Sequence, residues 1–137
     1  MAPPDRPEPA LASAPPAAPD VFDETCSARH ALALVASKWS VLILSALADG
    51  PTRNAELLCR IGGISQKMLA QTLRDLERNG LVLRQDFHTA RPCVEYRLSP
   101  LGESLSETLT ALDRWAERNF PALDAAREAF DARERDL

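Results

Sequence analysis

The sequence has few of the features that mark membrane, secreted and metal-binding proteins. No apolar run approaches the roughly 18 residues that a membrane span requires, and the N-terminus lacks the basic and then apolar order of a secretion signal. The three cysteines are an odd number at wide spacing without a CxxC pair, so neither a disulfide framework nor a structural zinc module is indicated. We therefore expect a cytoplasmic protein with no membrane contact, no cofactor, no metal and free thiols.

Catalytic patterns are missing as well. The chain has no glycine-rich phosphate loop, no histidine paired with a nucleophile and no carboxylate pair in an apolar setting. No segment repeats at a period of roughly 20 to 50 residues. We therefore expect neither an enzyme nor a solenoid, and 137 residues with 45% hydrophobic content fit one folded domain.

The charge is unevenly distributed along the chain. A net charge of −4 argues against a nucleic-acid partner for the chain as a whole. Residues 53–97, however, hold eight basic against five acidic side chains, whereas residues 1–25 and 98–137 are each acidic by four charges. A basic island between acidic ends is compatible with a DNA reader, although a solvated arginine-rich surface has the same composition.

The composition predicts three segments. Residues 1–20 contain seven of the eleven prolines and six alanines, which is typical of a disordered tail. Residues 21–120 carry the periodic apolar residues of a folded domain. Residues 121–137 are polar, and we expect them to form a helical but loosely held extension.

Two helices are predicted before Pro51. Thr25 or Ser27 can cap the first helix, which carries Ala31, Leu32 and Val35 on one face. Ser37-Lys38 interrupts it. The second helix ends at Asp49-Gly50-Pro51, and its apolar residues follow the i, i+3, i+4, i+7, i+8 pattern: Trp39, Leu42, Ile43, Ala46 and Leu47.

Two further helices are predicted around a glycine pair. Thr52 can cap a third helix, which Gly62-Gly63 stops. The apolar residues of that helix are Leu57, Leu58 and Ile61. Ser65 starts a fourth helix that Asn79-Gly80 closes. Its inward face carries Leu69, Leu73 and Leu76, and its opposite face carries Lys67, Gln71, Arg74 and Arg78.

A hairpin and a long helix complete the domain. Residues 81–87 and 93–98 are predicted strands, and the tip between them contains Arg91. Ser99-Pro100 opens the last helix, which has Phe120 near its end. Its apolar stripe is longer than one small domain needs and therefore predicts a homodimer: Leu101, Leu105, Leu109, Leu112 and Trp115.

This order of elements predicts a mainly α (α+β) fold, a winged helix-turn-helix with a two-stranded β wing and a C-terminal dimerisation helix. The second motif helix of such a fold enters the major groove of double-stranded DNA, where glutamine suits adenine and lysine or arginine suits guanine. Arg91 at the hairpin tip would reach a minor groove. The predicted DNA-binding residues are Gln66, Lys67 and Gln71 near bases, Arg74 and Arg78 near phosphates, and in addition Ser65 and Arg91.

Several motifs resemble the HxlR-type bacterial regulators, a winged-helix group related to the MarR-type proteins. The resemblance covers roughly residues 26–118, and Ile64-Ser65-Gln66-Lys67-Met68-Leu69 is its most specific part. It implies a cytoplasmic, nucleoid-associated dimer that pairs through its first and last helices, binds a palindromic operator near a promoter and represses or activates an adjacent gene. The other carriers are Cys26, Lys38-Trp39, Leu42-Ile43-Leu44, Asp49-Gly50-Pro51, Glu56-Leu57, Gly63, Leu73-Arg74-Asp75-Leu76-Glu77, Gly80-Leu81-Val82, Val94-Glu95-Tyr96 and Pro100-Leu101-Gly102.

Two residues depart from the family pattern. Asn54 stands where the family usually places an aromatic residue that packs the small motif helix. Cys93 stands where the family often places an arginine beside Val94-Glu95-Tyr96. The first departure predicts different packing of the motif helix. The second departure either leaves the wing contact to Arg91 or weakens that contact.

Cys26 is the candidate redox-sensing residue. It lies at a predicted helix N-terminus, where the helix dipole favours a thiolate, whereas Asp23 and Glu24 beside it oppose one. The resemblance implies a sensor of oxidants or electrophiles at this position, in some members through a disulfide across the dimer. Cys59 is expected in the core, and Cys93 on the wing.

Two other functions stay open at this point. Cys26 and His30 lie one helical turn apart, and His88 and Cys93 flank the hairpin tip, which leaves a metal- or ligand-responsive repressor as an alternative. The amphipathic last helix also permits a helical interaction protein that binds no DNA.

Overall fold

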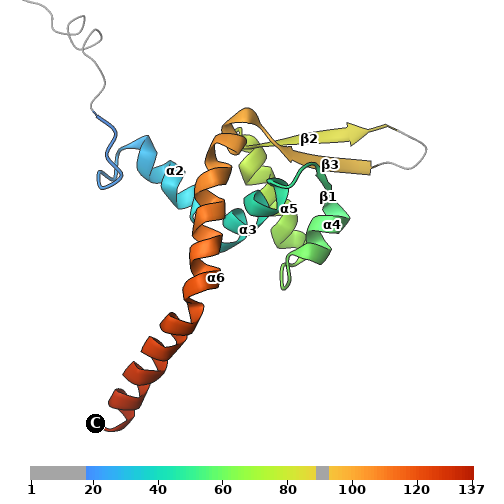
Figure 1. Cartoon of the computed structure of the whole chain (residues 1–137). Helices are drawn as coiled ribbons and strands as arrows, with labels where there is room; N and C mark the ends of the chain where they lie inside the picture. The colour runs from blue at the N-terminus through green and yellow to red at the C-terminus, as the bar shows by residue number, and fades with distance from the viewer. Residues whose placement is uncertain (1–17, 89–92) are drawn as a thin grey trace, which may run out of the picture. The chain divides into compact units, whose positions relative to one another are not determined.

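The computed structural model describes residues 18–88 and 93–137 (Figure 1). It divides the chain into one unit up to Val35 and a second from Ala36 to Leu137. Most of the predicted N-terminal tail, residues 1–17, and the predicted wing-tip residue Arg91 lie outside the described residues.

The described part of the first unit consists of a short turn region and helix α2, Ser27–Val35. The Asp23 carboxylate accepts hydrogen bonds from the backbone N–H and the hydroxyl of Thr25, at 2.9 and 2.8 Å. Thr25 is thus engaged before the helix, and Cys26, rather than Thr25 or Ser27, directly precedes it. Among the described residues of α2 none is buried, and Leu32 is half exposed.

Helix α3, Lys38–Leu47, forms the centre of the second unit. Ser37 caps it, accepting a hydrogen bond from the backbone N–H of Ser40, as the interruption at Ser37-Lys38 predicted. The buried face differs from the predicted stripe, because Leu44 is buried while Leu42 is exposed and Trp39 is only half-buried. Its buried residues are Ser40, Ile43, Leu44, Ala46 and Leu47.

A short strand, β1 (Thr52–Arg53), lies where the sequence predicted a helix cap. Thr52 pairs with Tyr96, and Arg53 with Glu95, in an antiparallel arrangement. Helix α4, Asn54–Arg60, therefore begins after Arg53, whose backbone N–H donates to the Glu56 carboxylate at 3.4 Å. The prediction that Thr52 caps this helix was wrong, since Thr52 belongs to a strand.

Helix α5, Gln66–Arg78, follows the glycine turn as predicted. Ser65 caps it and accepts a hydrogen bond from the Met68 backbone N–H at 3.0 Å. Gly63 has φ +85°, a left-handed conformation that glycine adopts without strain. The buried residues of α5 include all three predicted leucines, Leu69, Leu73 and Leu76.

The hairpin consists of β2 (Val82–Phe87) and β3 (Cys93–Leu98), close to the predicted bounds. The two strands pair from Val82–Leu98 to Phe87–Cys93. With β1 they form a three-stranded antiparallel sheet in the order β1-β3-β2. The wing therefore has a third, short strand that the two-residue β1 contributes.

Helix α6 runs from Pro100 to Arg135, through Pro121, where the sequence analysis placed the end of the domain. Ser99 caps it by accepting a hydrogen bond from the Gly102 backbone N–H at 3.0 Å. In Figure 1 the C-terminal half of α6 extends away from the other elements of this unit. Gly102 and Leu109 are the buried residues of this fully described helix, so the described residues leave most of its apolar stripe uncovered.

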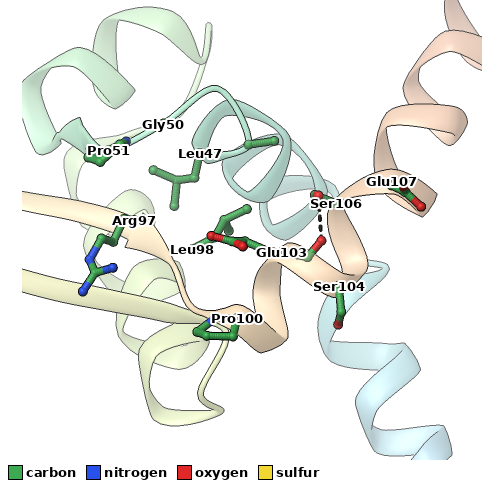
Figure 2. A pocket seen from close by; sticks show the side chains of 11 residues that line it. Leu47, Gly50, Pro51, Arg97, Leu98, Pro100, Glu103, Ser104, Ser106 and Glu107 are labelled. Carbon is green, nitrogen blue, oxygen red and sulfur yellow. Dashed lines mark hydrogen bonds between the residues drawn. The ribbon is translucent and has the colours of Figure 1, made fainter.

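An open pocket lies between the end of α3, β3 and the first turns of α6 (Figure 2). Glu103, Ser106 and Glu107 line it from α6 and Arg97 from β3. The Ser106 hydroxyl donates to the backbone carbonyl of Glu103 at 2.7 Å. Helix α5 contributes no residue to the lining among the described residues, so this pocket is separate from the predicted DNA-binding helix.

In the described part of the chain no single helix is long and apolar enough to cross a membrane. By length and composition alone, the bent pair of α2 and α3 taken together would be long and apolar enough.

Candidate nucleic-acid interface

Helix α5 is held by its apolar face and leaves its polar face exposed. Leu69, Leu73 and Leu76 have no exposed surface, and the helix packs against α3 and β2. Burial of three leucines stabilises this arrangement by roughly 1.5–3 kcal/mol each. The opposite face therefore keeps a fixed direction relative to the rest of the unit.

Five of the predicted DNA-binding residues lie on the exposed surface of α5: Gln66, Lys67, Gln71, Arg74 and Arg78. Ser65 is also exposed, and its hydroxyl oxygen caps the helix. The helix thus presents two amide and three cationic side chains on the surface that is not buried against α3 and β2.

The N-terminal ends of α4 and α5 are joined by side chains. The Asn54 amide nitrogen donates to the Gln66 side-chain oxygen at 3.2 Å. Each residue is the first of its helix. At this position, where a departure from the family pattern was noted, Asn54 makes a polar contact with α5.

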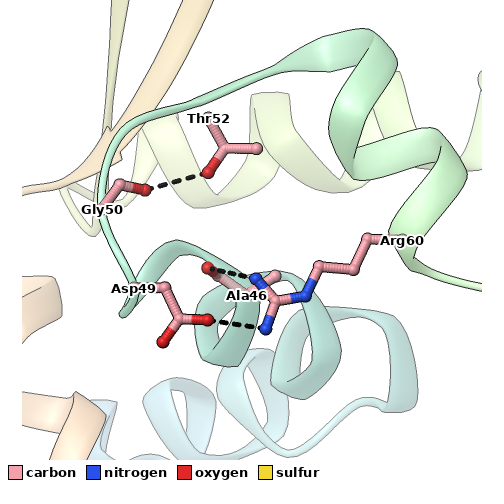
Figure 3. Close-up of polar contacts among 5 residues, drawn as sticks. All are labelled: Ala46, Asp49, Gly50, Thr52 and Arg60. Atoms are coloured by element: carbon pink, nitrogen blue, oxygen red, sulfur yellow. Dashed lines mark hydrogen bonds and ion pairs between the residues drawn. The ribbon is translucent and has the colours of Figure 1, made fainter.

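A second polar contact joins the end of α4 to the end of α3 (Figure 3). The Arg60 guanidinium lies 2.6 Å from the Asp49 carboxylate and donates to the Ala46 backbone carbonyl at 3.4 Å. Both charged side chains are more than half exposed, so an ion pair of this kind contributes about 0.2–1 kcal/mol. It ties the first motif helix to the scaffold and lies outside the exposed face of α5.

Additional cations lie on the three-stranded sheet, whose strand β2 packs against α5. Arg53, Arg84 and Arg97 are exposed on β1, β2 and β3. Arg84 lies 3.9 Å from Asp86, which partly offsets its charge. These three residues were not among the predicted DNA-binding residues, although they contribute to the excess of basic side chains in residues 53–97.

The three cysteines all lie in the described part of the chain and are free thiols. Cys26 is partly exposed, and the Asp20 backbone N–H donates to its sulfur at 3.5 Å. Hydrogen bonds from the backbone N–H groups of Asp20, Ala28 and Arg29 lower the pKa of Cys26. Burial of the thiol raises the pKa of Cys26, but by less than the hydrogen bonds lower it, and Asp23 and Glu24 make no contribution to the shift.

The prediction for Cys59 was wrong, because this residue is exposed. Leu57 and Ile61, four positions apart, point inward from this segment, and a residue midway between them faces away. Cys93 is partly exposed at the start of β3.

In residues 18–88 and 93–137 no three side chains of the His, Cys, Asp and Glu types come together as a metal site requires. Cys26 and His30 therefore have no third ligand among these residues.

A helix pair joined by a glycine turn, with an exposed polar second helix beside a β hairpin, defines a winged helix-turn-helix protein. Within that class the chain belongs to the HxlR-like helix-turn-helix family, which matches residues 34–124. The family consists of transcription regulators, in agreement with the resemblance seen in the sequence.

The relatives of this chain include regulators of the same kind. The chain is 46% identical to the uncharacterized HTH-type transcriptional regulator YtfH of Escherichia coli K12 over 80% of this chain and 86% of that protein. The structure of the putative transcriptional regulator ytfH from Salmonella typhimurium is 45% identical, covers 81% of this chain and 99% of its own, and superposes with a TM-score of 0.75. The redox regulator HypR in its reduced form is 30% identical over 72% of this chain and 98% of its own, with a TM-score of 0.66.

Proposed function

We propose that this transcription regulator binds a palindromic operator as a homodimer and reads it with α5. The observation that carries the proposal is the two-sided character of α5, whose leucine face is buried while its amide and cation face is exposed. Gln66, Lys67 and Gln71 would contact base edges, and Arg74 and Arg78 would contact phosphates. Such a protein would act in the cytoplasm, at the nucleoid.

The homodimer is supported by the uncovered face of α6. Leu112, Trp115 and Phe130 are each about half exposed. Exposed apolar side chains gathered on one element mark an interaction surface, and a second copy of the chain with two-fold symmetry would place two α5 helices against successive major grooves. The remaining apolar residues exposed on this helix are Leu101, Phe120 and Leu123.

Selection of bound fragments from random duplex DNA by the full chain tests this function. We expect enrichment of one sequence with two-fold symmetry, and an affinity that falls steeply with salt because cations on α5 displace counterions from phosphates. Absence of any enriched sequence would overturn the proposal. A weak salt dependence would favour a helical interaction protein instead.

For the segments, we propose a folded domain at residues 21–120 between a tail at 1–20 and a polar extension at 121–137. Deletion of residues 1–20 should leave dimer formation and operator affinity nearly unchanged. A large loss of either would assign the tail a part in the domain.

A second function, response to oxidants or electrophiles, is favoured by the surroundings of Cys26. Three backbone N–H groups stabilise its thiolate, and the similar protein HypR is a redox regulator. Diamide would accept two electrons and two protons, becoming a hydrazine, while two thiols form one disulfide. Such a bond at the start of α2 would alter the spacing of the two reading helices, which must stay about 34–36 Å apart.

Operator binding by wild type, Cys26→Ser and Cys93→Ser, measured before and after diamide, tests this response. We expect the change to disappear in Cys26→Ser and a crosslinked dimer of the wild type on non-reducing gels. An unaltered response in Cys26→Ser would exclude the residue as the sensor, and loss of the response only in Cys93→Ser would assign it to the wing. Metal analysis of the purified protein tests the metal-responsive alternative.

A further inference from the structure

Lys38 and Trp39 are the first two residues of helix α3, and the DNA contacts proposed above use neither of them. Resting on the proposed reading role of α5, we propose that Lys38 is a further DNA-binding residue, whose ammonium group binds a phosphate of the strand beside the groove that α5 enters. Trp39 is the positioning residue that holds this ammonium group in place. The ligand is the phosphodiester backbone, so the contact adds affinity without base preference.

One indole ring contacts both the cation and the turn before α5. The Lys38 ammonium nitrogen lies over the face of the Trp39 ring, 4.2 Å from its centroid. The edge of the same ring is close to the glycine turn, because a Cβ atom at Gly63 would lie 3.9 Å from Trp39 Cη2. Gly63 precedes Ser65, the cap of α5, by two residues. The ring therefore holds Lys38 beside the beginning of the reading helix.

The charge of Lys38 is available for a ligand. Its side chain is exposed, while Trp39 is half-buried. Among the described residues Lys38 takes part in no ion pair, whereas Arg60 pairs with Asp49. A side chain that already lies against a ring also loses less conformational freedom when it binds, because its stem is ordered in the free protein.

The fold places this cation where a DNA strand would run. The first turn of α5, with Gln66 and Lys67 exposed, is the part that would enter a major groove. Such a groove is about 12 Å wide, and a phosphate backbone borders it on each side. We expect the turn that leads into α5 to pass over one of these borders, and the Trp39 ring holds Lys38 beside that turn.

Lys38 adds a contact that the sheet does not supply. Helix α3 has ten residues and is therefore about 15 Å long. Its last turn lies beside β3, since Leu47 and Arg97 line the same pocket (Figure 2). Lys38 lies at the opposite end of the helix. Cations at the two ends of α3 would therefore reach different phosphates.

The salt dependence of DNA affinity tests this contact. Affinities of full-length wild type, Lys38→Gln and Lys38→Arg for the selected operator and for unrelated duplex DNA are measured at several salt concentrations. We expect Lys38→Gln to reduce the slope of log affinity against log salt by about 1 for each protomer bound, and to weaken binding to both DNAs alike. Lys38→Arg retains the charge and the ring contact, so it should retain the slope.

Arg133→Gln is the matched control. Arg133 also lies over an aromatic ring, 5.5 Å from the centroid of Phe130, but near the end of α6. The substitution removes the same charge and the same type of contact, and it should leave the slope unchanged. Thermal unfolding verifies that each variant is folded.

A double-variant cycle tests the role of Trp39. Trp39→Leu keeps an apolar side chain but removes the aromatic face, so Lys38 is no longer held. We expect this substitution to weaken binding to unrelated DNA by about twofold to fivefold, the equivalent of one exposed cation–π contact, and by less in the Lys38→Gln background. Simple additivity of the two substitutions would overturn the positioning role of Trp39.

The outcomes separate the two proposals. A wild type whose DNA affinity does not depend on salt overturns the proposed function. A wild type with a steep slope that Lys38→Gln leaves unchanged, or that Arg133→Gln reduces equally, overturns the role of Lys38 alone. A loss of affinity confined to the operator would assign Lys38 to a base contact and overturn the phosphate contact.

Discussion

Gly102, in the first turn of α6, lies directly against the backbone carbonyl of Leu81. A Cβ atom at Gly102 would overlap the Leu81 carbonyl oxygen and approach the Leu98 side chain at 3.2 Å. The same carbonyl accepts a hydrogen bond from the Ser99 backbone N–H at 3.0 Å, so it is not free to move aside. The start of α6 can therefore cross the start of the hairpin this closely only with glycine at this position.

Gly102→Ala should lower the free energy of unfolding by about 1–3 kcal/mol, the usual cost of overpacking a close contact. Chemical denaturation measures the loss. Gly62→Ala is the control, because nothing lies within 4 Å of a Cβ atom there, and it should be nearly neutral. Equal stability of the two variants would contradict the close contact.

Lys67→Ala and Gln71→Ala should each relax base discrimination by about 1–3 kcal/mol, because both side chains lie on the early exposed turns of α5. Arg78→Ala, at the last turn, should weaken binding to all sequences alike. Titrations with the selected operator and with unrelated DNA give the ratio of specific to nonspecific affinity. If that ratio is unchanged in the first two variants, α5 is not the reading helix.

Leu112→Asp should weaken the homodimer about tenfold or more, because this half-exposed side chain lies in the middle of the uncovered stripe of α6. Sedimentation at micromolar concentration measures the equilibrium. Glu128→Ala, an exposed polar change on the same helix, should leave it unchanged. A wild-type protein that sediments only as a species of 15.0 kDa would contradict the dimer itself.

The thiol of Cys26 should react at a lower pH than an ordinary cysteine, because backbone N–H groups lower its pKa. A lowered pKa means that the thiolate is present from a lower pH upward. In a variant with both Cys59→Ser and Cys93→Ser, Cys26 is the remaining thiol, and its rate of alkylation by iodoacetamide can be measured as a function of pH. The pH at which this rate reaches half its maximum should be lower in the folded chain than in the urea-unfolded chain. Coincident midpoints would show that the turn before α2 does not stabilise the thiolate.

The elements predicted correctly are those with a strong local signal. Helix α5 follows from the glycine pair, the Ser65 cap and three leucines on one face, all of which act within a few residues. Strand β1 could not be predicted in this way, because two residues carry no alternation and its partners Glu95 and Tyr96 lie more than forty positions away. Residues 121–137 were expected to be helical, and α6 does continue through Pro121 to Arg135 as one helix.

The same distinction applies to the candidate site. The exposed residues of α5 follow from helical periodicity, whereas the Asn54–Gln66 contact depends on how two helices meet at a turn. The exposure of Cys59 could have been predicted from helical periodicity, because Leu57 and Ile61 define the inward face of that segment. It was missed because apolar neighbours in sequence were taken as neighbours in space.

Strand β1 also determines where the chain tolerates a change in length. Arg53 pairs with Glu95 in the hairpin and is followed at once by Asn54, the first residue of α4. One residue inserted between Arg53 and Asn54 would either rotate the start of α4 by about 100° or shift the pairing of β1 by one position, which turns its side chains to the other face. The direct succession of β1 and α4 therefore fixes the start of α4 relative to strand β3, because no residue separates Arg53 from Asn54.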